Sequence, residues 1–242
     1  MAKKFKLTSN SVDISEANVT VYQIEALRDF GNVKKGDRGG FIQSEDNLSQ
    51  EGNCWVYDTS KVLENAKVSG NARVLNDAWL SDDAQAYDNA VISDSTLSCN
   101  AKVYGNAIVK ERAWITGNAK VYDNAEVCCY NACVYGDAAV HGDATVMNLA
   151  KVYGNAEVCD GARISGKAKV YGDAKVYGKA TVFENAEVCG HAKVYDNARV
   201  YGCTKLDGDV EVNGNTQLYD IIRALRSVKV IKNGDTEIVM LK

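Results

Sequence analysis

The sequence predicts an all-β solenoid, in which a single chain winds through stacked parallel coils. Three observations predict this fold class: a six-residue phrase recurs along most of the chain, the phrase is just long enough for one short strand and one turn, and the 242 residues contain no proline. Repeats of this kind indicate a fold in which each unit contacts mainly its neighbours. Because proline is absent, almost every backbone N–H can donate to the adjacent coil.

Composition and charge exclude several other classes of protein. Lys and Arg number 28 against 32 Asp and Glu, a net charge of −4, so no nucleic-acid partner is expected. No apolar run reaches about 18 residues, so no membrane span is expected, and the basic start lacks the apolar stretch of a secretory signal. The eight cysteines lack CxxC zinc spacing, so we expect reduced thiols in a cytoplasmic protein and no metal site.

Residues 1–53 precede the repeat and break its phrase. Short alternating strands are expected at Phe5–Leu7 and Val19–Ile24. An open parallel solenoid exposes unpaired strand edges, and these must be covered. The sequence therefore predicts a small N-terminal β cap over residues 1–53.

Residues 54–219 form the predicted solenoid. The phrase, as in Asn118–Asp123 (Asn-Ala-Lys-Val-Tyr-Asp), gives 28 six-residue units, and Ala lies two positions before the aliphatic residue in 22 of them. Ala-x-Val is strand alternation, so both small and aliphatic side chains point inward and the residue between them points outward. Gly-Asn, Gly-Asp and Asp-Asn pairs supply the turns because these residues tolerate left-handed backbone conformations.

Two irregular steps interrupt the six-residue spacing. The step from Ile92 to Leu97 is one residue short, and the step from Val127 to Val134 is one residue long. Since a coil has a fixed perimeter, we expect a tightened corner near Asp94 and an extruded bulge at Cys128-Cys129.

Residues 220–242 form the predicted C-terminal cap. Ile221, Ile222 and Leu225 give Asp220–Ser227 the pattern of a short amphipathic helix. Asn233-Gly234 between two apolar runs, Val228–Ile231 and Glu237–Leu241, is typical of a β-hairpin. This unit covers either its own chain or a neighbouring subunit, and the sequence favours its own chain.

The phrase resembles the hexapeptide repeat of left-handed parallel β-helices, with an aliphatic position followed four residues later by a small one. In that family three units make a triangular coil of eighteen residues. The resemblance therefore implies a single-stranded left-handed β-helix of about nine coils, a prism roughly 45 Å long. The chain departs from the family at the position after the aliphatic residue, which here is often an outward-pointing Tyr.

A second resemblance lies at the start of the chain, to bacterial YdcK-like hexapeptide proteins and prophage-type sequences. It rests on Ile24–Phe30, Gly36, Gly39-Gly40, Asn47–Ser49 and Gly52–Asp58. Proteins of this group are called acyltransferases because of their fold, and a fold does not imply a function. The resemblance implies phage or prophage origin and self-association, commonly as trimers.

Stacking by eighteen residues, or nineteen across the long step, predicts outward rows of aromatic side chains. The predicted rows are Tyr135–Tyr153–Tyr171, Tyr177–Tyr195 and Phe183–Tyr201–Tyr219. Such rows either stabilise the coils themselves or provide an interaction surface, and the sequence favours the first. Outward Lys interleaved with Glu predicts a mixed-charge, soluble face.

The two histidines, His141 and His191, are the candidate catalytic residues. The resemblance to hexapeptide-repeat acyltransferases implies an outward His as general base in a cleft between subunits. Register places His141 between Tyr122 and Cys159, and His191 at a corner between two aspartates. No long loop interrupts the repeat to wall an active site, so both assignments depend on oligomerisation.

The leading functional hypothesis is a non-enzymatic scaffold or interaction protein that presents a rigid β-helical surface. Its expected partners are further copies of the chain, as a trimer or dimer, or another protein. No cofactor is expected. The first alternative is a CoA-dependent acyltransferase, with acetyl-CoA or another acyl-CoA as cosubstrate, and the second is a small-molecule binder at a subunit interface.

Overall fold

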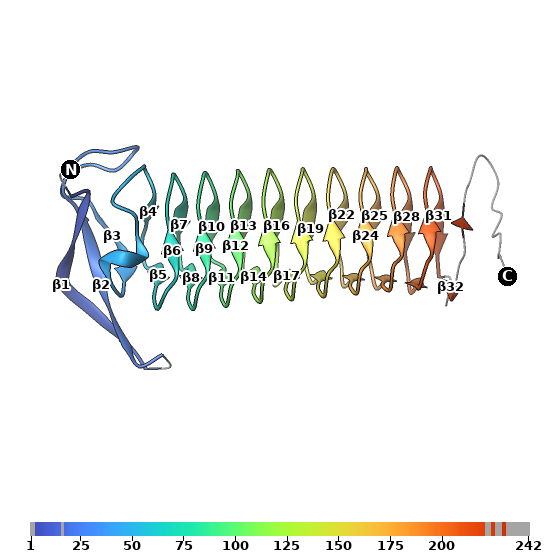
Figure 1. Ribbon diagram of the computed structural model, residues 1–242, viewed down its shortest axis with the longest axis horizontal. Coiled ribbons are helices and arrows are strands. Elements are labelled where there is room, and N and C mark those ends of the chain that lie inside the picture. The colour runs from blue at the N-terminus through green and yellow to red at the C-terminus, as the bar shows by residue number, and fades with distance from the viewer. Residues whose placement is uncertain (1–2, 16, 221–223, 226–228, 231–242) are drawn as a thin grey trace.

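The chain folds into a stack of short coils along one long axis. The computed structural model describes residues 3–15, 17–220, 224–225 and 229–230. Strands of two or three residues alternate with turns, and successive coils are joined by parallel pairing (Figure 1). The predicted all-β parallel solenoid is confirmed, with about ten turns where about nine were expected. Left-handed winding stays a prediction.

Three sheets run along the stack. Sheet 1 contains β1 (Phe5–Ile14), β2 (Val19–Ala26), β3 (Arg38–Ile42), β5 (Lys61–Val62), β8 (Trp79–Leu80), β11 (Thr96–Leu97), β14 (Trp114–Ile115), β17 (Cys133–Val134), β20 (Lys151–Val152), β23 (Lys169–Val170), β26 (Glu187–Val188), β29 (Lys205–Asp207) and β32 (Ala224–Leu225). Sheet 2 contains β4 (Trp55–Val56), β7 (Arg73–Leu75), β10 (Val91–Ser93), β13 (Ile108–Lys110), β16 (Glu126–Cys128), β19 (Thr145–Met147), β22 (Arg163–Ile164), β25 (Thr181–Val182), β28 (Arg199–Tyr201) and β31 (Gln217–Tyr219). Sheet 3 contains β6 (Lys67–Val68), β9 (Gln85–Ala86), β12 (Lys102–Val103), β15 (Lys120–Val121), β18 (Ala139–Val140), β21 (Glu157–Val158), β24 (Lys175–Val176), β27 (Lys193–Val194), β30 (Glu211–Val212) and β33 (Lys229–Val230).

The N-terminal strands extend sheet 1 beyond its first coil. Strands β1 and β2 pair antiparallel, β3 continues antiparallel to β2, and β3 then pairs in parallel with β5. Strands predicted at Phe5–Leu7 and Val19–Ile24 lie within β1 and β2 and are confirmed, although both are longer than predicted. Parallel stacking therefore already begins at β3, upstream of residue 54, and the short 3₁₀ helix η1 (Glu45–Asn47) follows it.

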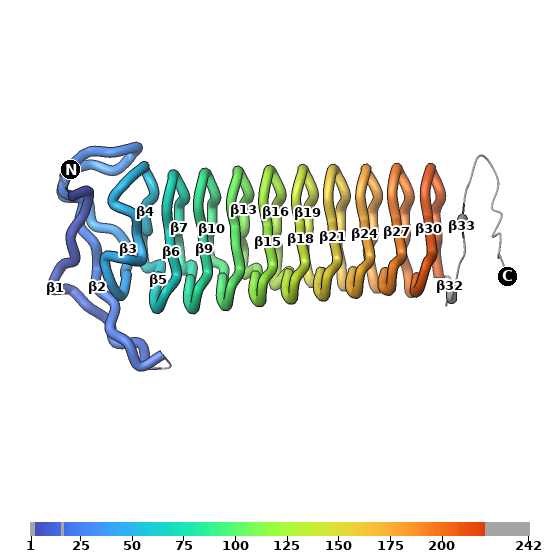
Figure 2. Tube along the Cα trace, in the orientation of Figure 1, coloured from blue at the N-terminus to red at the C-terminus, as the bar shows by residue number. Residues whose placement is uncertain are grey.

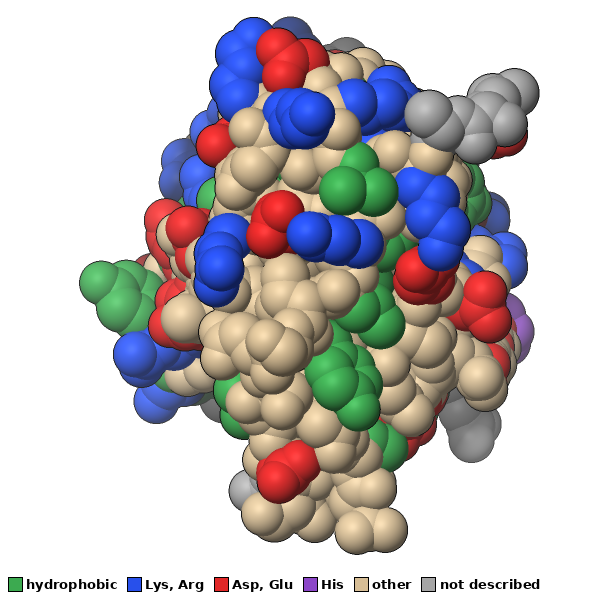
Figure 3. Space-filling model, turned by 90° about the vertical axis from the view of Figure 1, so that its left-hand side faces the viewer, with side chains coloured by type: hydrophobic (Ala, Val, Ile, Leu, Met, Phe, Trp, Pro, Cys, Tyr) green, Lys and Arg blue, Asp and Glu red, His purple; other side chains and the backbone are tan. Residues whose placement is uncertain are grey.

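The end of the molecule at this N-terminal unit is charged and polar. Side chains of Lys and Arg are interspersed with those of Asp and Glu, and hydrophobic side chains form only a narrow strip (Figure 3). Mixed charge at the end of a sheet discourages pairing with another chain.

The interior of the stack is a narrow column of Val, Ile, Leu and Ala side chains. Val152 and Val170, which the sequence places inside, are both fully buried, as is Ala168. Lys169 precedes Val170 in β23 and is only half-buried, as outward alternation requires. The coil outline repeats with little change along the stack (Figure 2), because nearly every unit contributes the same inward volume.

Both irregular steps produce the predicted distortions, at the same corner between sheets 2 and 1. At the short step Asp94 turns with φ of 46°, and Ser95 takes the buried small-residue position. At the long step Cys129–Asn131 all have positive φ, and Tyr130 is 74% exposed. Cys128 itself remains in β16 and is buried, so the extruded bulge starts one residue later than predicted.

Glycine and aspartate alternate along the corner between sheets 3 and 2. The alternating residues, all with φ from 55° to 70°, are Gly70, Asp88, Gly105, Asp123, Gly142, Asp160, Gly178, Asp196 and Gly214. The Asp88 carboxylate accepts a hydrogen bond from the Gly105 N–H at 3.2 Å, which ties one coil to the next. A Cβ atom at Gly105 would lie 2.8 Å from the backbone nitrogen of Asp123, so Gly105 has no room for a side chain.

Parallel pairing continues past residue 219. Strand β32 pairs with β29, so Ala224–Leu225 are extended where the sequence predicted part of the helix Asp220–Ser227. At these two residues the prediction is corrected. Ala224 lies six residues after Leu218 and opposite Leu206, so the repeat spacing continues here. Pairing with an open sheet edge satisfies backbone groups that such a short helix would leave to water.

Strand β33 lies within the predicted strand Val228–Ile231 and pairs in parallel with β30. Residues 221–223, 226–228 and 231–242 lie outside the described residues. The hairpin predicted around Asn233-Gly234 is therefore a prediction that falls outside the described chain.

Candidate functional site

His141 lies on the outer surface of sheet 3, directly after β18. Register pairs Val121 with Val140 and Val140 with Val158, which places His141 in the outward row between Tyr122 and Cys159. The His141 ring stacks on Tyr122 with centroids 4.6 Å apart and planes within 6° of parallel. The predicted position of His141 is therefore confirmed, and the stack fixes the plane of its ring.

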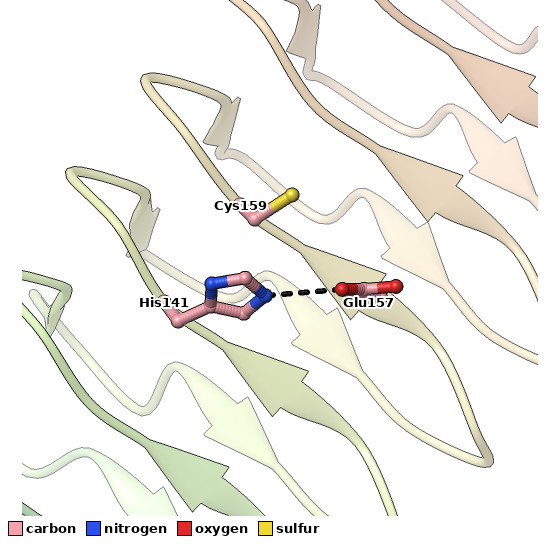
Figure 4. Close-up of side chains that lie close together, drawn as sticks. All are labelled: His141, Glu157 and Cys159. Carbon is pink, nitrogen blue, oxygen red and sulfur yellow. Dashed lines mark hydrogen bonds and ion pairs between the residues drawn. The ribbon is translucent and has the colours of Figure 1, made fainter.

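Carboxylates face both nitrogens of the His141 ring. Its Nε2 lies 3.1 Å from Glu157 Oε1, and its Nδ1 lies 3.8 Å from Asp123 Oδ2 (Figure 4 shows the Glu157 contact). The other Glu157 oxygen, Oε2, accepts a hydrogen bond from Lys175 Nζ at 2.6 Å. The Lys175 ammonium, and then the His141 ring, hold the pKa of the Glu157 carboxyl below its ordinary value, so this carboxylate is ionised at neutral pH.

Cys159 completes a cluster of three chemically different donors. Burial raises the pKa of the Cys159 thiol to about 11, and the negative charges of Asp160 and Glu157 act in the same direction. The ligand atoms of His141, Glu157 and Cys159 all lie within 4.8 Å of one another, and all three side chains are half-buried. The coil spacing brings together residues that are 16 and 18 positions apart.

His191 occupies the corner between β26 and β27, as predicted. Its side chain is 69% exposed, with Nε2 lying 3.6 Å from Asp173 Oδ2 and Nδ1 lying 3.6 Å from Asp209 Oδ1. A shallow depression beside it is lined by His191, Lys193, Asp209 and Glu211. His141 and His191 have separate partners, and the structure does not bring them into one site.

The surroundings of the two histidines limit what each can do alone. A general base needs a ring nitrogen free to accept the proton of an acceptor group. In His141, Nε2 is hydrogen-bonded to Glu157 and Nδ1 lies 3.8 Å from Asp123. Both nitrogens of His191 lie 3.6 Å from carboxylates, which is beyond hydrogen-bond distance. As a single chain, the protein therefore offers carboxylate-flanked rings on its surface, and the depression beside His191 is shallow and open to solvent.

Outward aromatic side chains stack as the sequence predicts. Stacked pairs with centroids 4.7–4.8 Å apart are Tyr135–Tyr153, Tyr153–Tyr171, Tyr177–Tyr195 and Phe183–Tyr201. Tyr219 continues the last row, but its ring is tilted by 36° from that of Tyr201. Sheet 3 also carries an earlier stack that leads to His141, through Tyr87, Tyr104 and Tyr122. The spacing placed His141 next to Tyr122 in this row, and the same eighteen-residue step (seventeen across the short step) extends the row back to Tyr104 and Tyr87.

Charged side chains between these rows pair with opposite charges. Ion pairs join neighbouring coils at Lys169–Glu187 (2.7 Å), Lys175–Glu157 (2.6 Å) and Lys193–Glu211 (3.4 Å). The predicted mixed-charge face is confirmed, and pairs this exposed contribute little stability each.

One apolar surface patch escaped the sequence analysis. Trp114, Tyr130 and Leu149, here called the corner patch, are 55%, 74% and 43% exposed and come from three successive coils. Tyr130 lies at the bulge created by the long step, Leu149 precedes β20 in the following coil, and Trp114 begins β14 in the preceding coil. Isolated large apolar side chains are ordinary on surfaces, but three in adjacent coils form a candidate contact surface.

Within the described part of the chain, no helix has the length and apolar character needed to cross a bilayer.

Part of the chain is similar in sequence to known β-solenoid repeat proteins. A family model described as the YdcK beta solenoid repeat matches residues 66–82. The protein named "Uncharacterized acetyltransferase YdcK" from Escherichia coli (strain K12) is 39% identical over 62 residues, which are 26% of this chain and 19% of that protein. The matched stretch thus spans about a fifth of that relative's length. The predicted resemblance to YdcK-like β-solenoid repeat proteins is confirmed over the matched part of the chain.

Proposed function

We propose that this protein is a rigid, non-enzymatic scaffold that presents flat β-solenoid surfaces to further copies of itself. The observation that carries the proposal is the unbroken register of the coils, which spaces outward rows of side chains evenly along the molecule. A catalytic pocket needs concavity and convergent polar groups, and a regular prism is poor in both. The hydrogen bond between His141 Nε2 and Glu157, at 3.1 Å, further supports a role without general-base catalysis at that histidine.

The corner patch is the surface we assign to the contact between copies. Trp114, Tyr130 and Leu149 supply apolar area that a monomer leaves in water. A row of lysines lies beside it, with Lys151, Lys167 and Lys169 lining a hollow next to Leu149. Aromatic side chains contribute strongly to interfaces because they bury large areas at low entropic cost. The expected assembly is a closed trimer or dimer.

Light scattering tests this assembly, and we expect a mass two or three times that of the 26.2 kDa chain. Tyr130→Asp should dissociate the oligomer, because it places a charge in the buried centre of the contact. Val12→Lys is the matched control, since Val12 is an exposed apolar residue of the N-terminal unit, 38% exposed, outside the corner patch. A monomeric parent protein, or a Tyr130→Asp variant with the parent mass, would contradict the proposal.

A CoA-dependent acyltransferase is the second candidate function. The name of the E. coli relative, an acetyltransferase, supports it, as does the depression beside His191. In that reaction a histidine would take the proton of an acceptor amine or hydroxyl, the acceptor would attack the thioester carbonyl, and CoA would leave as the thiol. A neighbouring subunit would have to wall the site, because a convex prism does not enclose CoA.

A thermal-shift panel with acetyl-CoA, CoA and nucleotides separates the candidates. Under the scaffold proposal none of these raises the unfolding midpoint, since only a bound ligand stabilises by mass action. If acetyl-CoA raises the unfolding midpoint, and His191→Ala or His141→Ala removes that increase, the acyltransferase replaces the scaffold proposal. A midpoint raised by nucleotides alone would favour the small-molecule binder.

The same proposal places the protein in the cytoplasm and in a phage or prophage context. Eight cysteines without a pairing pattern support a reducing compartment. The sequence resemblance to prophage-type proteins supports the context.

A further inference from the structure

We propose that His141, Glu157 and Cys159 form a binding site for a divalent transition-metal ion, with zinc as the best fit. The site is independent of the scaffold role, because it lies on the surface of sheet 3 and needs no second subunit. Neither the family match nor the named relative assigns a metal to this surface.

Two adjacent coils supply the three donors. His141 follows β18. Glu157 begins β21 and Cys159 follows that strand, so the side chains of Glu157 and Cys159 point outward on either side of the buried Val158. The ligand atoms lie within 4.8 Å of one another. Around zinc, with bonds of about 2.0–2.3 Å, neighbouring ligand atoms are about 3.5 Å apart. The three atoms are therefore close enough for side-chain rotations to bring them onto one ion.

The chemistry of the donors selects the class of metal. Imidazole nitrogen, thiolate sulfur and carboxylate oxygen together suit zinc and its neighbours, whereas calcium and magnesium require oxygen ligands. Three protein ligands leave the fourth tetrahedral position for water or an external ligand, the arrangement of zinc sites that bind a substrate. Such an ion would hold the thiol as thiolate.

Groups around the donors are arranged as in known metal sites. Asp123 lies 3.8 Å from His141 Nδ1, where a carboxylate orients the ring so that Nε2 faces the ion. Lys175 holds Glu157 Oε2 at 2.6 Å, which leaves Oε1 for coordination. Tyr122 fixes the plane of the imidazole from the other side. Contacts that do not use the coordinating atoms thus position His141 and Glu157. Their coordinating atoms, Nε2 and Oε1, already face each other at 3.1 Å.

His191 is an internal comparison that lacks one donor type. It also has carboxylates near both ring nitrogens, at 3.6 Å, but it is far more exposed. Its ion-pair partners are two aspartates, Asp173 and Asp209, and among the described residues only His141, Glu157 and Cys159 bring three donor atoms within 4.8 Å of one another. A variant at His191 therefore shows how much of the measured metal binding comes from an exposed histidine flanked by carboxylates.

Titration of the full chain with cobalt(II) tests the site. Cobalt bound by a thiolate gives a sulfur-to-metal charge-transfer absorption, so we expect that band to saturate at one equivalent and zinc to displace it. Cys159→Ser should abolish the band, and His141→Phe, which keeps a ring to stack on Tyr122, should weaken binding at least tenfold. Glu157→Gln should also weaken binding, by a smaller factor.

Two control variants should bind as the parent does. His191→Ala removes the other histidine, and Cys203→Ser removes an exposed cysteine outside the cluster. A parent protein without the charge-transfer band, or a Cys159→Ser variant that keeps it at one equivalent, would overturn the proposal. If Cys159→Ser fails to fold, the cobalt affinity of His141→Phe decides the question, because that variant retains the thiol and a ring to stack on Tyr122. An affinity equal to that of the parent would then overturn the proposal.

Discussion

Replacing Val170 by Asp is expected to destabilise the protein by about 5 kcal/mol, which places it among the most damaging single substitutions. Val170 is fully buried in β23, where its register partners in neighbouring coils are Val152 and Val188. A carboxylate there has no polar partner, and an unpaired buried charge costs far more than the lost methyl groups. The narrow interior column leaves no route for this short side chain to reach water.

Chemical denaturation of the variant measures the effect, and Lys151→Asp is the matched control. Lys151 precedes Val152 in β20, points outward and lies opposite Lys169. The same charge introduced there is solvated and meets an ammonium, so the midpoint should change little. Because solenoid repeats contact mainly their neighbours, hydrogen exchange should show the loss of protection centred on the coils around β23. Equal midpoints for the two variants would show that Val170 is not inside.

Much of the solenoid could be predicted because one local geometry is repeated. Once the aliphatic position is known, six-residue spacing decides which side chains point inward, and eighteen-residue spacing decides which lie above one another. Tyr135, Tyr153 and Tyr171 stack as expected because nothing else determines their position. The same logic placed His141 beside Cys159, and it located the distortion at Asp94 and, one residue too early, the bulge at Cys128-Cys129.

The features that the sequence did not predict are set by the length of extended side chains, by local backbone conformation and by where the repeat ends. Glu157 lies in a different outward row from His141, and only the extended side chain brings Oε1 to 3.1 Å of the ring. Tyr130 is exposed because three consecutive residues turn with positive φ, a conformation that spacing alone does not specify. Ala224 was overlooked because a helical pattern of apolar residues overlapped the continuing six-residue spacing.

The N-terminal unit also contains residues that no repeat pattern explains. Asn47 is buried in η1, and its side-chain amide donates to the carbonyls of Glu64 and Ala66, both at 2.9 Å. Lys4 is fully buried and donates to the Cys54 carbonyl at 3.0 Å, and burial lowers the pKa of its ammonium. These contacts join residues far apart in sequence, so composition and periodicity do not reveal them.

Replacing Trp55 by Ala is expected to cost about 3–5 kcal/mol, because a large buried aromatic side chain would leave a cavity. Trp55 begins β4 and is 1% exposed. Its indole packs edge-on against Phe30, with centroids 5.3 Å apart, and against Phe5 at 6.3 Å. Gly39 of β3 lies so close that a Cβ there would be 2.8 Å from the indole. One side chain thus joins β1, β3 and the first strand of sheet 2.

Phe183→Ala is the control for this prediction, because it removes an aromatic ring from the outer surface. Phe183 stacks on Tyr201 at 4.7 Å, and losing one such contact should cost about 1 kcal/mol. Denaturant midpoints compare the two variants, and limited proteolysis locates the damage. We expect Trp55→Ala to be cut first within residues 3–53, since those strands lose their shared packing against the first coil, while the later coils keep their own cores. A Trp55→Ala midpoint equal to that of Phe183→Ala would mean that the N-terminal strands are held by pairing to β5 alone.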